Sequence, residues 1–249
     1  ARQVLISEAN GLVDRFSSIN DRLNDQNDII NGQMEVVAGE ISTIGKAIAE
    51  LNEQIQFALA ASNGSPPNDM LDQRDKLITD LAKLVSVETV EQDGSAVNVF
   101  IGSGQTLVIG NESNEFFADA GSTDPSRIGL FFRVGESVQE VTAEIKGGQL
   151  GGMLEFRETV LDPTINGLGR VAISIAETFN QQHHLGIDFE GNKGGDFFED
   201  INTPSNTYLR VQGDSRNEKP NDRLVSLHIT DISQLTTDNY RMEFPGPSD

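Results

Sequence analysis

The sequence has no cysteine and no tryptophan among its 249 residues, and it contains tyrosine only twice. Without cysteine, the chain can form neither a disulfide nor a thiolate metal site. No apolar run approaches the roughly 20 residues that a helix needs to span a bilayer, and no cleavable signal peptide is recognisable. These absences argue against a disulfide-stabilised scaffold, a thiolate zinc domain and a helical membrane protein.

Positive charge is scarce. The chain has 18 Lys and Arg against 39 Asp and Glu, and its net charge is −21. Phosphate backbones and acidic lipid headgroups repel such a surface, so we expect neither nucleic acid nor a membrane as a partner. Hydrophobic residues without glycine make up 37%, against a usual level of about 45–50% that also counts glycine. With tryptophan absent and tyrosine present only twice, this favours a lean, elongated protein.

Proline is absent from residues 1–60, where apolar residues recur at helical spacing. From Ile30 to Ile55 the steps alternate between four and three, which is typical of helices that pack side by side. We predict one long helix with a bend or break near Gly32 or Gly39, because each glycine weakens a helix by up to ~1 kcal/mol.

A similar apolar spacing returns in a third helical region, residues 147–185. Together the two regions define a predicted helix-packing seam, which we expect to hold helices side by side. Its members are Ile30, Met34, Val37, Ile41, Ile44, Ile48, Leu51, Ile55, Leu154, Leu161, Ile165, Leu168, Ile175 and Phe179. The residues from Ile44 to Ile55 are expected to face the helix of residues 147–183.

Between these regions the period changes from helical to alternating. The segment "SNGSPPND" (62–69) is expected to end the first helix, and Asp69 to cap a second one over residues 70–84. From Val85 the apolar residues alternate, and Asp93-Gly94 is a hairpin-turn signal. Further alternating segments separated by turns predict a small antiparallel β unit.

The sequence beyond Leu161 is less regular. Pro163 either kinks the third helix or opens a new one with Asp162 as its cap. Alternating residues then predict strands over 208–211, 224–230 and 240–244, as the start of a second β domain.

Taken together, these segments predict an α+β protein, an elongated helical bundle or rod with an inserted antiparallel β subdomain and the start of a second β domain. We expect the sheets at the end of the rod. The predicted boundaries are 1–84 for the two rod helices, 85–146 for the small β unit, 147–185 for the returning helical segment and 186–249 for a loop and a partial outer β domain. The chain starts within a helical pattern and stops after a strand pattern, so we expect an excised fragment.

No catalytic, metal-binding or cofactor-binding residue is predicted, and no cofactor. His183 and His184 end a predicted helix, where the dipole favours a cation, and His228 is expected on a strand surface. Arg74 beside Asp75 is interpreted as part of a set of solvated charge pairs on a helix.

One acidic loop, residues 188–199, matches the ligand positions of a calcium-binding loop. The matching residues are Asp188, Glu190, Asn192, Asp196 and Glu199. Lys193 stands where such a loop needs glycine, so we favour a tight acidic loop with three inward phenylalanines, Phe189, Phe197 and Phe198. A calcium-dependent extracellular adhesin or binding module remains the alternative function, and a hydrolase using Asp196 and Glu199 is a third hypothesis.

Three segments carry a resemblance to a known family. They are "FSSINDRLNDQ" (16–26), "MLDQRDKLITDLAKLVSVETVEQDGSAVNVFIGSGQTLVIG" (70–110) and "GGQLGGMLEFRETVLDPTINGLGRVAISIAETFNQQHHLGIDFEGNKGGDFF" (147–198). They resemble, in the same order, the family of the first hook–filament junction protein of the bacterial flagellum, hook-associated protein 1. Filament flagellin and the second junction protein are weaker matches.

The resemblance implies a structural, non-catalytic subunit that joins hook to filament. It implies export through the flagellar type III apparatus without a cleaved signal, and an extracellular location in the flagellum. The implied partners are other copies of the chain in a ring, the hook protein, the second junction protein and an export chaperone for a missing C-terminal region. This chain would be a central piece that lacks both terminal helices.

Overall fold

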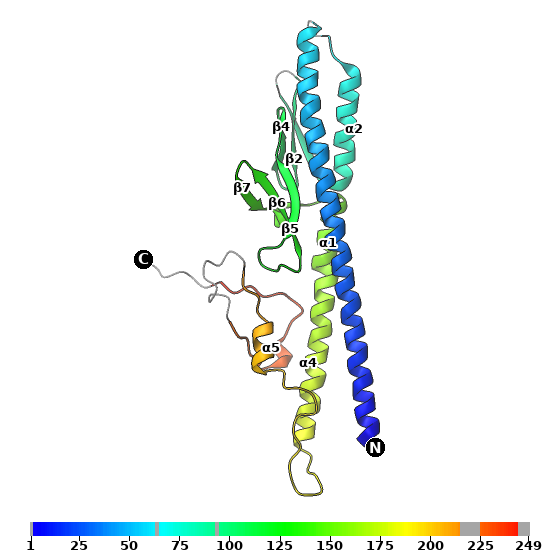
Figure 1. Cartoon of the computed structure of the whole chain (residues 1–249), viewed down its shortest axis with the longest axis vertical. Coiled ribbons are helices and arrows are strands. Elements are labelled where there is room, and N and C mark those ends of the chain that lie inside the picture. The colour runs from blue at the N-terminus through cyan, green and yellow to red at the C-terminus, as the bar shows by residue number, and fades with distance from the viewer. Residues whose placement is uncertain (1, 63–64, 93–94, 215–224, 244–249) are drawn as a thin grey trace, which may run out of the picture. The chain divides into compact units, whose positions relative to one another are not determined.

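The computed structural model describes residues 2–62, 65–92, 95–214 and 225–243 (Figure 1). They form two compact units, one of residues 27–156 and one of residues 1–26 with 157–249. Long helices accompany two small antiparallel sheets, which confirms the predicted α+β class. The four domain boundaries drawn from the sequence stay predictions.

Helix α1, Arg2–Ala61, is continuous over 60 residues and runs through both units. The predicted break near Gly32 or Gly39 is therefore wrong. A Cβ at either glycine would meet nothing within 4 Å, whereas Met34 and Ile41 are fully buried. Burial of the opposite face outweighs the loss of about 1 kcal/mol of helix propensity at each glycine.

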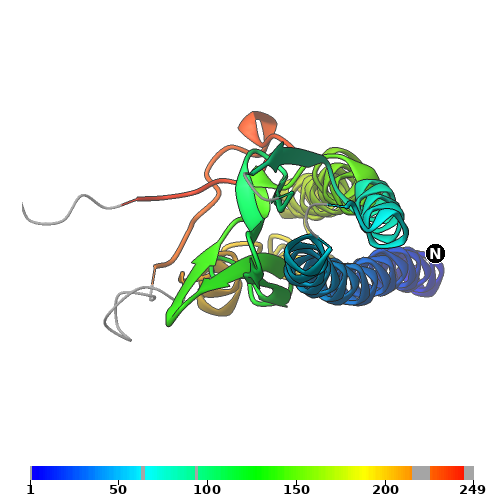
Figure 2. The same ribbon diagram turned by 90° about the horizontal axis from the view of Figure 1, so that it is seen from above.

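In the unit of residues 27–156, helix α2 (Asn68–Leu84) turns back beside α1 (Figures 1 and 2). The prediction that Asp69 caps this helix is wrong. Pro67 holds the N-cap position, and its carbonyl accepts hydrogen bonds from the amides of Met70 and Leu71. Asp69 lies in the first turn instead, where its charge favours the helix dipole.

The joint between α2 and the first strand is closed by a segment from far along the chain. Val85 is already extended and fully buried, and the amide of Ser86 donates to the carbonyl of Lys146 at 2.9 Å. Gly148 has φ +58°, and a Cβ there would lie 2.4 Å from the backbone of Leu84 and Val85. The helix can pass directly into a strand because the returning chain covers the joint.

Two sheets follow. The first, in the order β1-β2-β3-β4, contains β1 (Val87–Glu91), β2 (Val97–Ile101), β3 (Gln105–Ile109) and β4 (Glu112–Ser113). The second, in the order β5-β6-β7, contains β5 (Glu115–Ala120), β6 (Ile128–Val134) and β7 (Ser137–Glu140), and a 3-10 turn η1 (Thr142–Glu144) follows it. All pairs are antiparallel. Residues 93–94, the predicted hairpin turn, lie outside the described residues.

Both sheets lie alongside α1, so the expectation that they sit at the end of a rod is wrong for this unit. A Cβ at Gly45 would touch the Leu107 side chain at 3.0–3.2 Å, and the Phe116 amide donates to the Ser42 hydroxyl. A sheet with one apolar face must bury that face against another layer, and α1 provides an apolar surface wide enough to do so.

The second half of the chain begins with α3 (Gly148–Phe156), which packs against α2, and continues through a π-helical turn, η2 (Arg157–Leu161), into α4 (Asp162–His184). Pro163 lies in the first turn of α4, where its ring suits the helical φ although it cannot donate a hydrogen bond to the π-helical turn before it. The π-helical turn makes the helix continuous from α3 into α4. No new helix therefore begins at Pro163, and Asp162 does not act as a cap.

Beyond α4, the described residues contain a short helix, α5 (Pro204–Leu209), and a 3-10 turn, η4 (Ile232–Gln234). The strands predicted over 208–211, 224–230 and 240–244 are wrong wherever they fall on described residues, because α5 ends within the first and the other two form no ladder. Thr203 caps α5 by accepting from the Asn206 amide. Residues 224 and 244 are not described.

Candidate functional site: helix seam and attachment points

The predicted seam residues of α1 lie on its buried face. Seven of the eight are buried, namely Ile30, Met34, Val37, Ile41, Ile44, Ile48 and Ile55, and Leu51 is half-buried. Of the predicted seam residues in the second helical region, Leu161 is buried and Phe179 is 44% exposed. Leu154, Ile165, Leu168 and Ile175 are half-buried. The role of these fourteen residues in holding helices together stays a prediction.

Along its buried face, α1 also contacts both sheets and α2. Ser42 and Gly45 meet the strands, while Asn52 bonds to Arg74 of α2. The expected contact between this stretch and residues 147–183 stays a prediction. Sequence reasoning missed the sheet contacts, although Gly45 between the apolar residues of a predicted helix was an available signal of close approach.

Asn52 is the centre of a buried polar cluster. It is fully buried, and its Nδ2 donates to the carbonyls of Val97 (2.9 Å) and Gly110 (2.6 Å). Its Oδ1 accepts from the Val97 amide at 3.1 Å and from Arg74 Nη1 at 3.0 Å. The same Nη1 donates to the Ser95 carbonyl at 2.5 Å. The cluster thus attaches the first sheet to α1 and α2.

Arg74 is therefore buried, not solvated as the sequence indicated. Only 6% of it is exposed, and in the described part of the chain it forms no ion pair with a carboxylate within 4.0 Å. Burial lowers the pKa of the Arg74 guanidinium, while the charges of Asp75 and Glu91 act in the opposite direction. Its hydrogen bonds to Asn52 and Ser95 offset part of the cost of removing the cation from water.

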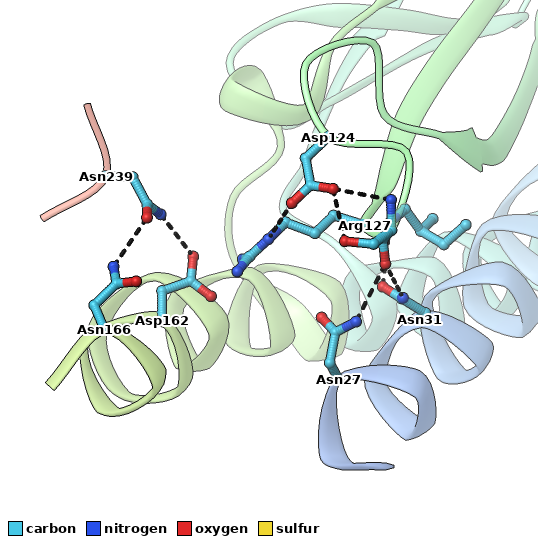
Figure 3. Close-up of polar contacts among 9 residues, drawn as sticks. Asn27, Asn31, Asp124, Arg127, Asp162, Asn166 and Asn239 are labelled. Atoms are coloured by element: carbon cyan, nitrogen blue, oxygen red, sulfur yellow. Dashed lines mark hydrogen bonds and ion pairs between the residues drawn. The ribbon is translucent and has the colours of Figure 1, made fainter. Parts of the chain in front are cut away.

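A second attachment joins the loop before β6 to α1 (Figure 3). Asn27 and Asn31 lie one helical turn apart, and both side-chain amides donate to the Ser126 carbonyl, at 3.2 and 3.0 Å. Asn31 Oδ1 also accepts from the Ile128 amide at 3.1 Å. Within the loop, Asp124 Oδ2 forms an ion pair with Arg127 Nε at 3.0 Å. The bonds of Asn27 and Asn31 attach the loop before β6 to the side of α1.

In the other unit, α4 holds the segment that follows it. Asn180 Nδ2 donates to the Phe198 carbonyl at 2.9 Å, and Asn180 Oδ1 accepts from the amides of Phe197 and Phe198, each at 2.8 Å. The rings of Phe197 and Phe198 lie 6.1 and 5.8 Å from that of Phe179. Phe189, predicted to point inward, is fully exposed, because its loop projects away from this cluster.

A further contact fixes a more distant segment to α4 (Figure 3). Asn166 Nδ2 donates to the Thr237 carbonyl and to Asn239 Oδ1, both at 2.9 Å. Asn239 Nδ2 in turn reaches Asp162 at 3.5 Å. Asparagine side chains therefore make several of the contacts between a helix and a non-helical segment.

The acidic loop uses its carboxylates internally. Asp188 Oδ1 accepts from the amides of Glu190 and Asn192 at 2.8 Å, and Asp196 pairs with His184 at 2.7 Å. The hydrogen bonds from Asn192, chiefly from its backbone, hold the pKa of Asp188 below its usual range. Among the described residues, no group of three or more acidic, His or Cys side chains could hold a metal ion.

The predicted histidine positions differ in outcome. His183 and His184 do end α4, and His183 Nδ1 lies 2.6 Å from the Gly195 carbonyl. His228 is exposed, but its segment forms no strand.

Among the described residues, none of the helices combines the length and the apolar character that a membrane-spanning segment needs.

Comparison with known proteins decides the family. Residues 1–198 match the model of the FlgK helical domain, the helical domain of a flagellar hook-associated protein. The chain belongs to the FlgK family. The resemblance carried by "MLDQRDKL" and the two other segments is thereby confirmed.

FlgK relatives match almost the whole chain. It is 38% identical over 99% of its length to flagellar hook-associated protein 1 of Salmonella typhimurium strain LT2, and 35% identical over 98% to that of Escherichia coli strain K12. It spans 44% of the length of each of these relatives.

A solved FlgK structure is also similar. The flagellar hook junction protein of Burkholderia pseudomallei superposes with a TM-score of 0.71 at 34% identity, over 78% of this chain and 35% of that protein. The fold described above is therefore that of a known FlgK region.

Proposed function

We propose that this chain is part of a structural subunit of the bacterial flagellum that joins the hook to the filament. The observation that carries the proposal is its similarity, over 99% of the chain, to a protein named flagellar hook-associated protein 1. The solved relative is likewise named a flagellar hook junction protein. Since the chain spans 44% of that first relative, the role of the whole subunit is what is proposed.

The proposed mechanism is packing without catalysis. The buried polar side chains that would otherwise mark a reactive centre are engaged in attachment: Asn52 and Arg74 hold a sheet, and Asn180 holds a loop. The fourteen seam residues are proposed to keep helices side by side. In this interpretation, the helices carry load along their length, while amide contacts fix the projecting parts.

The proposed partners are further copies of the chain in a ring, the hook protein, the second junction protein and an export chaperone. The proposed location is the extracellular flagellum, reached through type III export. Support comes from the apolar residues that α1 exposes near its start: Val4, Leu5 and Ile6 are 49–62% exposed. Side chains of this kind suit packing between helices of neighbouring subunits.

Electron microscopy of the bacterium tests this function. The codons for residues 27–156 are removed in frame from the gene for the full-length protein, and an intact copy is supplied as the matched control. We expect cells that retain hooks but shed filaments, with flagellin accumulating in the medium. The intact copy should restore attached filaments.

Normal attached filaments in the deletion strain, with the shortened protein confirmed by immunoblot, would refute the junction function. Loss of the hooks as well as the filaments would also contradict it, since a subunit that joins hook to filament acts beyond the completed hook.

A further inference from the structure

The same hydrogen-bonding arrangement occurs at three places among the residues that the structure describes. In each, one asparagine amide bonds to both the N–H and the C=O of a single distant residue: Asn52 with Val97, Asn180 with Phe198, and Asn202 with Ile229. The bonds from Asn52 and Asn202 to the backbone that they attach measure 2.6–3.1 Å. Paired bonds of this kind reproduce what a neighbouring strand would supply.

Asn52 continues a strand ladder that the backbone leaves incomplete. The pairing of β2 with β3 shifts at a bulge between Val99 and Phe100, and its last matched pair is Val99 with Val108. Beyond it, Asn52 bridges Val97 and Gly110, whose carbonyls both accept from its Nδ2. The amide thus occupies the position of the next backbone rung.

Asn202 supplies at Ile229 the two hydrogen bonds that a neighbouring strand would supply. Residues 225–230 alternate between half-buried and exposed but form no ladder. The amide of Ile229 donates to Asn202 Oδ1 at 3.0 Å, and Asn202 Nδ2 donates to the Ile229 carbonyl at 2.9 Å. The amide of Leu227 donates to the Thr207 carbonyl of α5 at 3.0 Å. These bonds hold the segment to α5 and to the residues just before it.

Two of the three asparagines are each held by an arginine. Arg74 Nη1 donates to Asn52 Oδ1 at 3.0 Å, and Arg210 Nη1 donates to Asn202 Oδ1 at 3.2 Å. Each arginine also donates to carbonyls of the attached region: Arg74 to Ser95, and Arg210 to Leu227 at 3.1 Å. Arg210 bonds in addition to the Ile201 carbonyl.

An arginine in this position fixes which way the amide points. A guanidinium can only donate, so the atom facing it must be the amide oxygen. The amide nitrogen is then directed at the carbonyls of the attached segment. At Asn180 the oxygen accepts from two backbone amides, so no arginine is needed there.

We propose that Arg74 and Arg210 are positioning residues that orient the Asn52 and Asn202 amides, and that each Arg–Asn pair acts as a clamp replacing a missing strand partner. Burial lowers the pKa of both guanidinium groups. Each arginine donates to its own asparagine and to carbonyls beside it, so we expect its loss to act chiefly on the segment that it holds.

Amide hydrogen exchange in the intact chain tests the clamps. Arg74→Met should raise the exchange rate of the Val97 amide about tenfold or more, the scale of a lost hydrogen bond to a charged group. Arg74→Lys keeps donors and should raise it less. Lys83→Met is the matched control, because Lys83 lies exposed on the same helix and pairs only with Asp80; it should leave the Val97 rate unchanged.

The second clamp gives an independent test. Arg210→Met should raise exchange at Ile229 and leave Val97 unchanged, and Arg74→Met should do the reverse. An unchanged Val97 rate in a folded Arg74→Met chain would overturn the proposal, as would an equal rise at Leu130 in the second sheet. If Arg74→Met does not fold, Arg210→Met decides the question by the same criteria at Ile229.

Discussion

At the scale of single residues, the chain uses amides and glycines where other proteins use larger apolar side chains. Gly45 lets α1 approach Leu107 closely, and Asn52 joins the same helix to β2. Gly39, also within α1, has open space around it. Two residues of one type in one helix therefore differ only in what surrounds them.

That difference predicts effects of different size for the same substitution. Gly45→Val should lower the free energy of unfolding by about 1–3 kcal/mol, because the added methyl groups overpack against buried Leu107. Gly39→Val, the matched control, should change it by less than about 0.5 kcal/mol, since valine is a slightly better helix former than glycine. Urea denaturation followed by circular dichroism measures both, and equal effects would show that α1 does not contact β3 at Gly45.

Asp188 gives a pH prediction at the same scale. Its pKa is held below the usual range by hydrogen bonds from Asn192. Because the pKa of Asp188 is lower in the folded than in the unfolded state, the ionised carboxylate stabilises the loop at pH values above about 3.9, the unfolded pKa. This contribution is lost as the pH falls through the folded pKa. An NMR titration of the Asp188 carboxyl should give a value below about 3.9, and Asn192→Ala should raise it only in part, because the backbone bond remains. A wild-type value at or above the ordinary one would contradict the loop geometry.

At the scale of elements, α1 is the main organiser of the unit formed by residues 27–156. Its buried face includes Met34, Ile41, Ile48 and Ile55, each with no exposed area. Both sheets and α2 reach this face. A helix whose stability comes from such a face tolerates glycines on its other side, as the exposed Gly32 and Gly39 show.

The buried face is tested by two isoleucines of α1. Ile48→Ala should lower the free energy of unfolding by about 2–5 kcal/mol, because it removes a fully buried side chain and leaves a cavity. Ile29→Ala is the matched control: Ile29 is 53% exposed, and the change should stay within about 0.5 kcal/mol. Thermal melts report both, and a small loss for Ile48→Ala would refute its place in the core.

At the scale of the whole molecule, the chain consists of two compact units. The unit of residues 27–156 has its own core, formed between α1, α2 and two sheets. The other unit holds its outer segments through Asn166, Asn180 and the Asn202–Arg210 pair. A unit with its own apolar core can unfold as a separate cooperative step.

We therefore expect the intact chain to unfold in more than one calorimetric transition. Residues 27–156 produced alone should fold and reproduce one of these transitions, since the contacts of the core lie within that range. A single transition that fits a two-state model, together with an isolated segment lacking cooperative unfolding, would contradict the division into units.

Local sequence predicted the elements well where one apolar period was sustained. The alternating steps from Ile30 to Ile55 indicate one helix face, and the alternation in residues 128–134 indicates a strand, because each pattern depends on neighbours a few residues away. The prediction failed at residues 225–230, where the pattern of a strand is present but the partner is an asparagine side chain. Alternation indicates an extended backbone without saying what receives its hydrogen bonds.

What the sequence by itself determined is the long helices and small antiparallel strands up to about residue 185, and the family, since both follow from residues close together along the chain. The tertiary structure alone decided that the sheets lie alongside α1, that Arg74 is buried against Asn52, and that Asn202 serves as a strand partner. Arg74 and Asn52 are 22 positions apart in the sequence, and Asn202 and Ile229 are 27 positions apart. No local period encodes them, because their energy depends on the desolvation and geometry that only the assembled fold creates.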